Sequence, residues 1–199
     1  MNEQGLVSLR EHGIRGINYY WDRREQFGLT EAELAEVGIT GNEVLVHMHL
    51  IDALKAVDAV FRQKGYELYV KEGYRPVELY ELVYQKRVES GKADEANRLF
   101  NMTDMPHATG LSVDVTLWDI RRQREVYLRD GNDGVDALFV DFYKRKPGEV
   151  AEWYQVMQEW VIEVMQKHGF RLGTKREYFH FDYRPGTQYN YPISVEYKA

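Results

Sequence analysis

Hydrophobic and polar residues alternate between Ser112 and Trp118, a pattern typical of a half-buried β-strand. Val113, Val115 and Leu117 fall on one side of this strand, so Asp114 faces the other side. The same period appears in residues 66–71 and predicts a second strand, which a glycine- and proline-containing segment then ends. Residues 170–172 and 177–183 read as a hairpin around a short turn.

Three longer stretches have apolar residues at helical spacing. The first runs from Asn42 to Lys64, with Asn42 as the expected cap and Gly65 as the expected end. The second starts near Pro76, which suits a first helical turn, and continues towards residue 91. The third covers Glu149–His168. We expect the first and third of these to be core helices.

Residues 1–42 show no sustained period. Thr30–Leu34 resembles a capped helix start, because a threonine is followed three residues later by a glutamate. Ile17–Trp21 is an aromatic cluster, and such side chains either pack against a core or form one wall of a pocket. Tyr20 is the candidate for a substrate contact in that cluster.

The order helix, strand, helix, strand, helix, hairpin favours an α+β fold, with helices packed on one face of a small, mostly antiparallel sheet. A chain of 199 residues with 44% hydrophobic content is long enough for one core and short for two. We expect a single domain over residues 1–199, in which residues 1–42 form an N-terminal extension that packs on the core.

Composition narrows the function classes. A net charge of -6 leaves no surplus of Lys and Arg for phosphates, which argues against nucleic acid as a partner. The chain has no cysteine, so disulfides, thiolate catalysis and Cys-ligated metals are excluded. No apolar run approaches the ~20 residues of a membrane span. Without a signal-like start at Met1 we expect a cytoplasmic protein, or a periplasmic one if a signal peptide once preceded Met1.

Two separated stretches carry histidines next to acids. His107 lies in a turn that leads into the strand of Asp114, and Glu177 and His180 lie in the aromatic run near the C-terminus. We expect these stretches to meet in space, because two histidines and a carboxylate are the ligand types that a catalytic zinc takes. Taken singly, each spacing is common and does not distinguish a metal site from chance.

Arg75 lies where a strand gives way to a helix. Local sequence favours a surface ion pair with a neighbouring glutamate, and the alternative is a guanidinium aimed at a cleft, where it would bind an oxyanion or a carboxylate. In an extended chain Glu177 and His180 would point to opposite faces. A bulge or a strand start between them, or a helical segment, would remove this conflict.

The motifs Glu72-Gly73-Tyr74-Arg75-Pro76, His107-x-x-Gly110-x-x-x-Asp114 and Glu177-x-x-His180 together resemble those of the D-alanyl-D-alanine dipeptidases, zinc peptidases linked to vancomycin resistance. The resemblance covers about residues 43–192. It implies the fold of the D-alanyl-D-alanine carboxypeptidases and the hedgehog signalling domain. It also implies one zinc ion per chain, Glu177 as catalytic base, Arg75 as transition-state stabiliser, and the zinc ligands His107, Asp114 and His180.

Two positions depart from the family pattern. Met105 stands where family members have a serine that helps to hold the substrate's free amine. The region after the Asp114 strand lacks the family's usual Met-Gly segment before a substrate-binding Phe-Asp pair, and Asp141 is the nearest candidate for that aspartate. From the three motifs we expect a zinc dipeptidase for D-alanyl-D-alanine or a similar short peptide. The alternatives are a carboxypeptidase or endopeptidase acting on peptidoglycan stem peptides, and a binding module that keeps the zinc fold without turnover. The sequence does not specify the oligomeric state.

Overall fold

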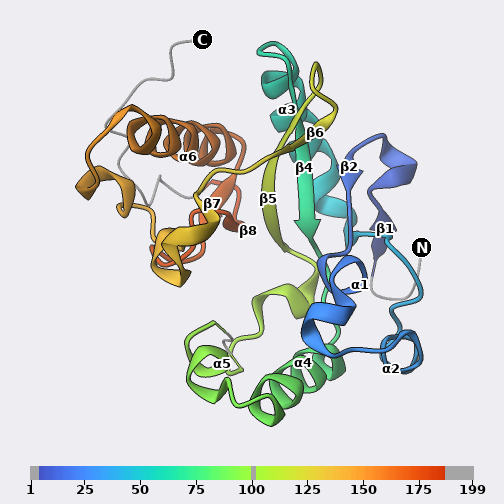
Figure 1. Ribbon diagram of the computed structural model, residues 1–199. Coiled ribbons are helices and arrows are strands. Elements are labelled where there is room, and N and C mark those ends of the chain that lie inside the picture. The colour runs from blue at the N-terminus through green and yellow to red at the C-terminus, as the bar shows by residue number, and fades with distance from the viewer. Residues whose placement is uncertain (1–4, 100–101, 187–199) are drawn as a thin grey trace. The chain divides into compact units, whose positions relative to one another are not determined.

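The computed structural model describes residues 5–99 and 102–186 (Figure 1). From its tyrosines and prolines we expect the tail, residues 183–197, to run across the surface, and this segment lies mostly outside the described residues. The chain mixes helices with strands in an α+β arrangement, as the sequence pattern predicts. Among the helices of the described part, none is long and apolar enough to cross a membrane.

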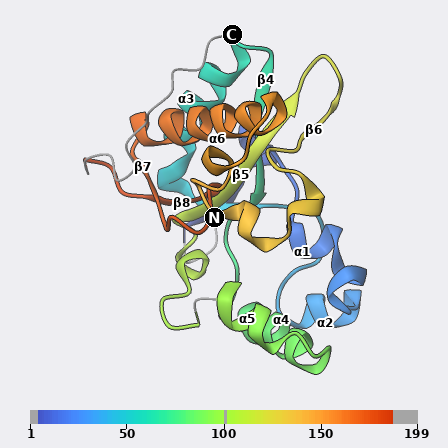
Figure 2. The same cartoon turned by 60° about the vertical axis from the view of Figure 1, so that its left-hand side comes forward.

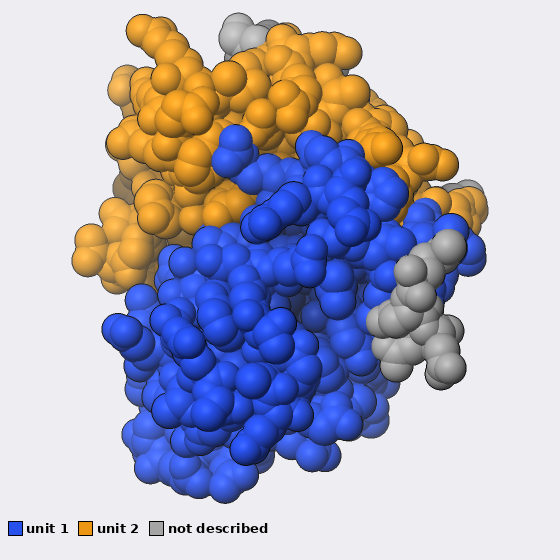
Figure 3. Space-filling model, turned by 90° about the vertical axis from the view of Figure 1, so that its right-hand side faces the viewer, with its two compact units in different colours: residues 1–49, 70–113 blue, residues 50–69, 114–199 orange. Residues whose placement is uncertain are grey.

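The chain forms two compact units, coloured separately in Figure 3. Unit 1 contains residues 1–49 and 70–113, and unit 2 contains residues 50–69 and 114–199. Neither unit is continuous in sequence, because the chain passes from one to the other three times. The single zinc-peptidase domain with a packed N-terminal extension stays a prediction.

In the residues that the structure describes, unit 1 holds a small sheet and four α-helices. Strand β1 (Leu6–Ser8) pairs antiparallel with β3 (Leu45–His47). The helices α4 (Val77–Glu89) and α5 (Ala93–Leu99) lie side by side in both ribbon views (Figures 1 and 2). The other elements wholly within this unit are β2 (Arg15–Gly16), α1 (Tyr19–Asp22) and α2 (Glu31–Glu36).

Unit 2 is built on two helices that contact each other. The Phe61 ring of one meets the Trp160 ring of the other edge to face, with centroids 4.9 Å apart. The longer helix, α6, also packs on β7. The elements of this unit are α3 (Ile51–Arg62), β6 (Arg124–Val126), α6 (Glu149–Lys167), β7 (Phe170–Leu172) and β8 (His180–Tyr183).

Two longer strands contribute residues to both units: β4 (Tyr66–Glu72) and β5 (Ser112–Asp119). The order of hydrogen-bonded strands is β2-β4-β5-β8-β7, and β6 pairs with β5. The pairs β5–β6 and β7–β8 are antiparallel, like β1–β3. In β5 the side chains of Val113, Val115 and Leu117 are buried, as the alternation predicts, but Ser112 and Thr116 on the other side are buried as well.

One predicted helix is wrong in its first third. Instead of a helix from Asn42, the chain forms β3, then a 3-10 turn, and α3 begins only at Ile51. Val44 and Val46 are buried at alternate positions, and the edge provided by β1 satisfies the backbone of this segment. Helical spacing farther along the chain masked this short strand, because three residues are too few to show a period.

The other long elements match their predictions. Strand β4, helix α4 and helix α6 begin and end within about two residues of the expected positions. The Thr30 hydroxyl accepts the Glu33 N–H at 3.2 Å, and the Glu33 carboxylate accepts the Thr30 N–H at 2.8 Å. This reciprocal pair is the capping box that the sequence predicts at the start of α2.

A buried polar network fixes the segment that precedes α6. The fully buried Glu159 carboxylate accepts from the Lys144 ammonium at 2.8 Å and from the Gln155 amide at 3.1 Å. Gln155 in turn donates to the Val140 carbonyl and accepts the Lys144 backbone N–H. Side chains of α6 therefore hold residues 140–144 through hydrogen bonds to their backbone and through an ion pair with the Lys144 ammonium.

Replacing Glu159 with alanine should lower the free energy of unfolding by about 2–4 kcal/mol, because it leaves buried donors without their acceptor. Urea titration followed by circular dichroism measures this. The matched control is Glu163→Ala on the same helix, whose ion pair with Lys167 is at the surface and should contribute less than about 1 kcal/mol. Equal losses for the two variants would contradict the assigned role of Glu159.

Candidate metal centre

His107 lies in a 3-10 turn, Pro106–Thr109, and is almost fully buried. Its Nδ1 is 2.8 Å from the Gly73 carbonyl oxygen, and its backbone N–H donates to the Tyr80 hydroxyl at 2.9 Å. A carbonyl only accepts, so Nδ1 carries the proton. The ring is therefore held in the tautomer whose Nε2 has the lone pair that binds metals.

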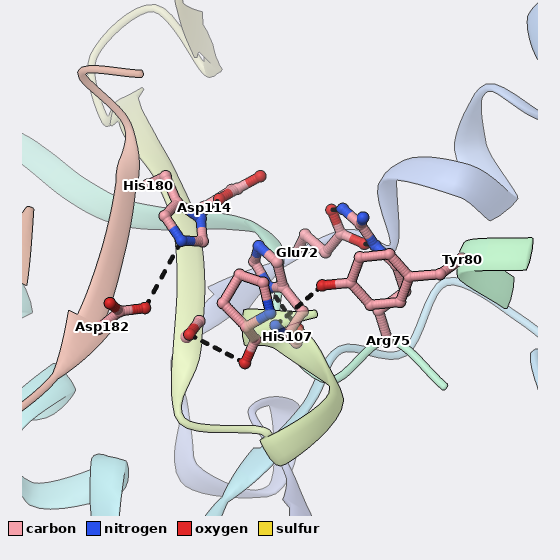
Figure 4. Close-up of polar contacts among 10 residues, drawn as sticks. Glu72, Arg75, Tyr80, His107, Asp114, His180 and Asp182 are labelled. Atoms are coloured by element: carbon pink, nitrogen blue, oxygen red, sulfur yellow. Dashed lines mark hydrogen bonds and ion pairs between the residues drawn. The ribbon is translucent and has the colours of Figure 1, made fainter. Parts of the chain in front are cut away.

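His180 opens strand β8 with carboxylates on both sides of its ring (Figure 4). Its Nδ1 is 2.8 Å from Asp114 Oδ1, and its Nε2 is 3.5 Å from Asp182 Oδ1. Burial lowers the pKa of this imidazole, but its hydrogen bonds to Asp114 and Asp182 outweigh burial and raise the pKa to about 10. The surroundings of the ring thus favour positive charge.

His107, Asp114 and His180 each offer one ligand atom, and these atoms all lie within 4.8 Å of one another. Within residues 5–99 and 102–186, these three residues are the one group of His, Cys, Asp or Glu side chains that lie close enough together to hold a metal ion. Two imidazoles and one carboxylate suit zinc, and the half-buried Asp114 and Asp182 carboxylates beside His180 supply negative charge that a cation would balance. The residues present therefore fit the implied metal.

Gly173 leaves room for the His180 ring. A Cβ at this position would lie 2.2 Å from His180 Cδ2 and 2.8 Å from His180 Nε2, far inside van der Waals contact. The Gly173 N–H donates to the His180 carbonyl at 3.0 Å, so the turn backbone approaches the histidine closely. Any side chain at 173 would have to move the imidazole.

Gly173→Ala should therefore weaken zinc binding about 10–100-fold, the usual effect of disturbing the support of a ligand. Competition with a chromogenic chelator measures the affinity. Gly131→Ala is the matched control, because its added Cβ would meet no atom within 4 Å. If the two variants bind zinc equally well, His180 does not depend on the space beside Gly173.

Glu177 lies in the turn just before β8 and is half-buried. Because the strand begins at His180, Glu177 is outside it, and the strict alternation of an extended chain does not separate the two side chains. This is the strand start that the sequence offered as one of its three solutions. The role of Glu177 as catalytic base stays a prediction.

Arg75 forms an ion pair with Glu72, the partner type that local sequence favours, but the pair is buried rather than at the surface. Arg75 Nε and Nη2 donate to the two Glu72 oxygens at 2.6 and 2.5 Å. Its Cζ lies 5.0 Å from the Tyr20 ring centroid and 4.2 Å from that of Tyr80. Burial lowers the pKa of Arg75, but the Glu72 carboxylate raises it above its usual value overall.

The three predicted substrate contacts lie in different settings. Tyr20 is buried in a hydrophobic cluster with Leu34 and Leu79, with Arg75 at its face. Met105 is half-buried and has a left-handed backbone, φ 42°, which is uncommon for a residue other than glycine. Asp141 is half-exposed and forms an ion pair with Lys144 at 3.1 Å. Their contact with substrate stays a prediction for all three.

Sequence reasoning missed three side chains beside the site. Asp182 had a usable signal, because residues two apart on a strand share a face and Asp182 follows His180 by two. The sequence predicts a glutamate partner for Arg75 but does not single out Glu72, which lies three residues before it. Tyr80 gave no signal, since its contact with His107 joins residues 27 positions apart.

No family model matches the chain, and no curated protein matches it. Among solved structures, one similar chain is the LdcB LD-carboxypeptidase, described in terms of peptidoglycan recognition, at 19% identity and TM-score 0.47. The match covers 71% of this chain and 60% of the LdcB chain. Another is a mutant of the vancomycin resistance D,D-pentapeptidase VanY, in complex with Zn(II), at 18% identity and TM-score 0.45. That match covers 71% of this chain and 74% of VanY. The identity is below 20% in both matches.

Proposed function

We propose that this protein is a zinc peptidase of the D-alanyl-D-alanine dipeptidase type, with zinc held by His107, Asp114 and His180. The observation that carries the proposal is the approach of three ligand atoms, one from each of these residues, to within 4.8 Å of one another. A site of two imidazoles and one carboxylate leaves a coordination position for water, the arrangement that distinguishes catalytic zinc from structural zinc.

Zinc at such a site lowers the pKa of water to about 7 and polarises a carbonyl group. A carboxylate oxygen of Glu177 accepts a proton from the attacking water, and Glu177 then passes this proton to the leaving amine. Arg75 donates to the oxygen that gains negative charge as the peptide carbon becomes tetrahedral. Glu72 holds the planar Arg75 guanidinium in one position, so little reorganisation is needed as that charge develops.

We infer that D-alanyl-D-alanine is the substrate, because the chain has the three motifs of the dipeptidases in the same order. Two observations favour the alternative substrate class, peptidoglycan stem peptides. Met105 has no hydroxyl for a substrate ammonium, and Lys144 already pairs with Asp141. A substrate without a free amine near the scissile bond avoids the cost of burying an unpaired ammonium.

Incubation of the zinc-loaded protein with a panel of D,D- and L,D-dipeptides and of longer stem peptides, followed by mass spectrometry, tests both classes. Free amino acids from dipeptides alone indicate a dipeptidase. Shortened stems indicate a carboxypeptidase or an endopeptidase. If every peptide is bound and none is cleaved, the protein is a binding module and the proposed peptidase function is wrong.

A further inference from the structure

Tyr80 makes two different contacts through two parts of its side chain. It lies in the first turn of α4 and is 1% exposed. Its ring faces the Arg75 guanidinium, with 4.2 Å between the ring centroid and Cζ. Its hydroxyl accepts the buried backbone N–H of His107 at 2.9 Å, a contact drawn in Figure 4. One side chain thus touches both the predicted oxyanion donor and a metal ligand.

The backbone around Tyr80 supports the same connection. The Arg75 N–H donates to the His107 carbonyl at 3.1 Å, and the His107 ring donates to the Gly73 carbonyl at 2.8 Å. Both contacts join the exit of β4 to the turn that carries His107. These backbone contacts set the distance between the two segments, and Tyr80 adds a contact from the helix that follows.

We propose that Tyr80 is a positioning residue with two separable roles. Its hydroxyl holds the His107 backbone, and so the direction of the metal-binding imidazole. Its ring holds the Arg75 guanidinium by a cation–π contact, in addition to the ion pair that Arg75 makes with Glu72. The first role rests on metal binding alone, and the second rests on the proposed peptidase function.

The two roles have different physical origins and can be removed one at a time. Tyr80→Phe keeps the ring beside Arg75 and deletes the acceptor of a buried N–H, which then lacks its Tyr80 partner. Tyr80→Leu deletes both the hydroxyl and the π-face, whose attraction for a guanidinium depends on the ring quadrupole. The difference between the two variants therefore isolates the ring.

The test measures zinc affinity by chelator competition and, separately, kcat at saturating zinc on whichever peptide the wild type cleaves. Tyr80→Phe should bind zinc about tenfold more weakly and recover wild-type kcat when zinc is saturating. Tyr80→Leu should show the same weaker zinc binding and keep a kcat about tenfold lower at saturating zinc. Tyr84→Phe is the matched control on the same helix, because its hydroxyl donates to exposed Asn97 at 2.8 Å; it should change neither quantity.

Wild-type zinc affinity in Tyr80→Phe would overturn the hydroxyl role, provided that circular dichroism shows both proteins folded. Wild-type kcat in Tyr80→Leu would overturn the ring role. If the wild type cleaves no peptide, the proposed function fails and the ring role falls with it, whereas the zinc affinities still decide the hydroxyl role. Tyr80→Phe preserves side-chain volume, so misfolding of the leucine variant alone leaves the hydroxyl test intact.

Discussion

Replacing Glu177 with alanine should lower kcat by about 10²–10⁴-fold and leave zinc content unchanged. A carboxylate that takes the proton of the attacking water contributes a factor of this size, because without it the proton must pass to solvent as the bond forms. Glu177 is absent from the three residues whose ligand atoms gather at the site, so its removal should not release the metal. Initial rates on the preferred peptide, with zinc measured on the same samples, give both quantities.

Two further substitutions sharpen this prediction. Glu177→Gln keeps the shape of the side chain and cannot accept the proton in the same way, so it should be as inactive as the alanine variant. Glu177→Asp keeps the carboxylate and shortens its reach, so it should retain part of the activity. Full activity in Glu177→Gln would contradict the assignment of Glu177 as the base. Loss of zinc in all three variants would instead show that Glu177 supports the metal.

Replacing Arg75 with methionine should lower kcat by about 10²–10³-fold, the usual loss when one donor to a developing oxyanion is removed. It should also lower the free energy of unfolding by about 3–5 kcal/mol, because the Glu72 carboxylate then stays buried without its partner. Activity at low temperature and urea titration measure the two effects separately.

The double variant Glu72→Gln, Arg75→Met separates catalysis from stability. It removes the uncompensated buried charge, so much of the lost stability should return while kcat stays low. Arg75→Lys should also remain poorly active, since an ammonium cannot reproduce the two-point contact with Glu72. Recovery of activity together with stability in the double variant would show that Arg75 acts only as a structural ion pair.

The sequence predicted most of the longer helices and strands. Helix α6 and strand β5 carry enough apolar positions to show their spacing, and Gly169 and Gly65 both adopt the left-handed backbone expected after a helix. It failed for the short strands. β3 has three residues, and its burial depends on β1, which lies about 40 residues earlier in the chain.

For the site, the sequence supplied the ligand types and the order of the motifs, and the structure brings His107, Asp114 and His180 together. Their supporting contacts were not predictable, because the Tyr80 hydroxyl and the Gly73 carbonyl reach His107 only through the fold. The burial of Arg75 was also missed. A buried guanidinium needs both a carboxylate clamp and nearby aromatic rings, and no local pattern reports that combination.

The central claim is that His107, Asp114 and His180 hold one zinc ion. Equilibrium dialysis against buffered zinc, followed by metal analysis, tests it most directly in the wild type and in His107→Ala and His180→Ala. We predict about one zinc per chain in the wild type and almost none in either variant at the same free zinc concentration, with all three proteins folded. Stoichiometric zinc in both variants, or none in the wild type, would contradict the account.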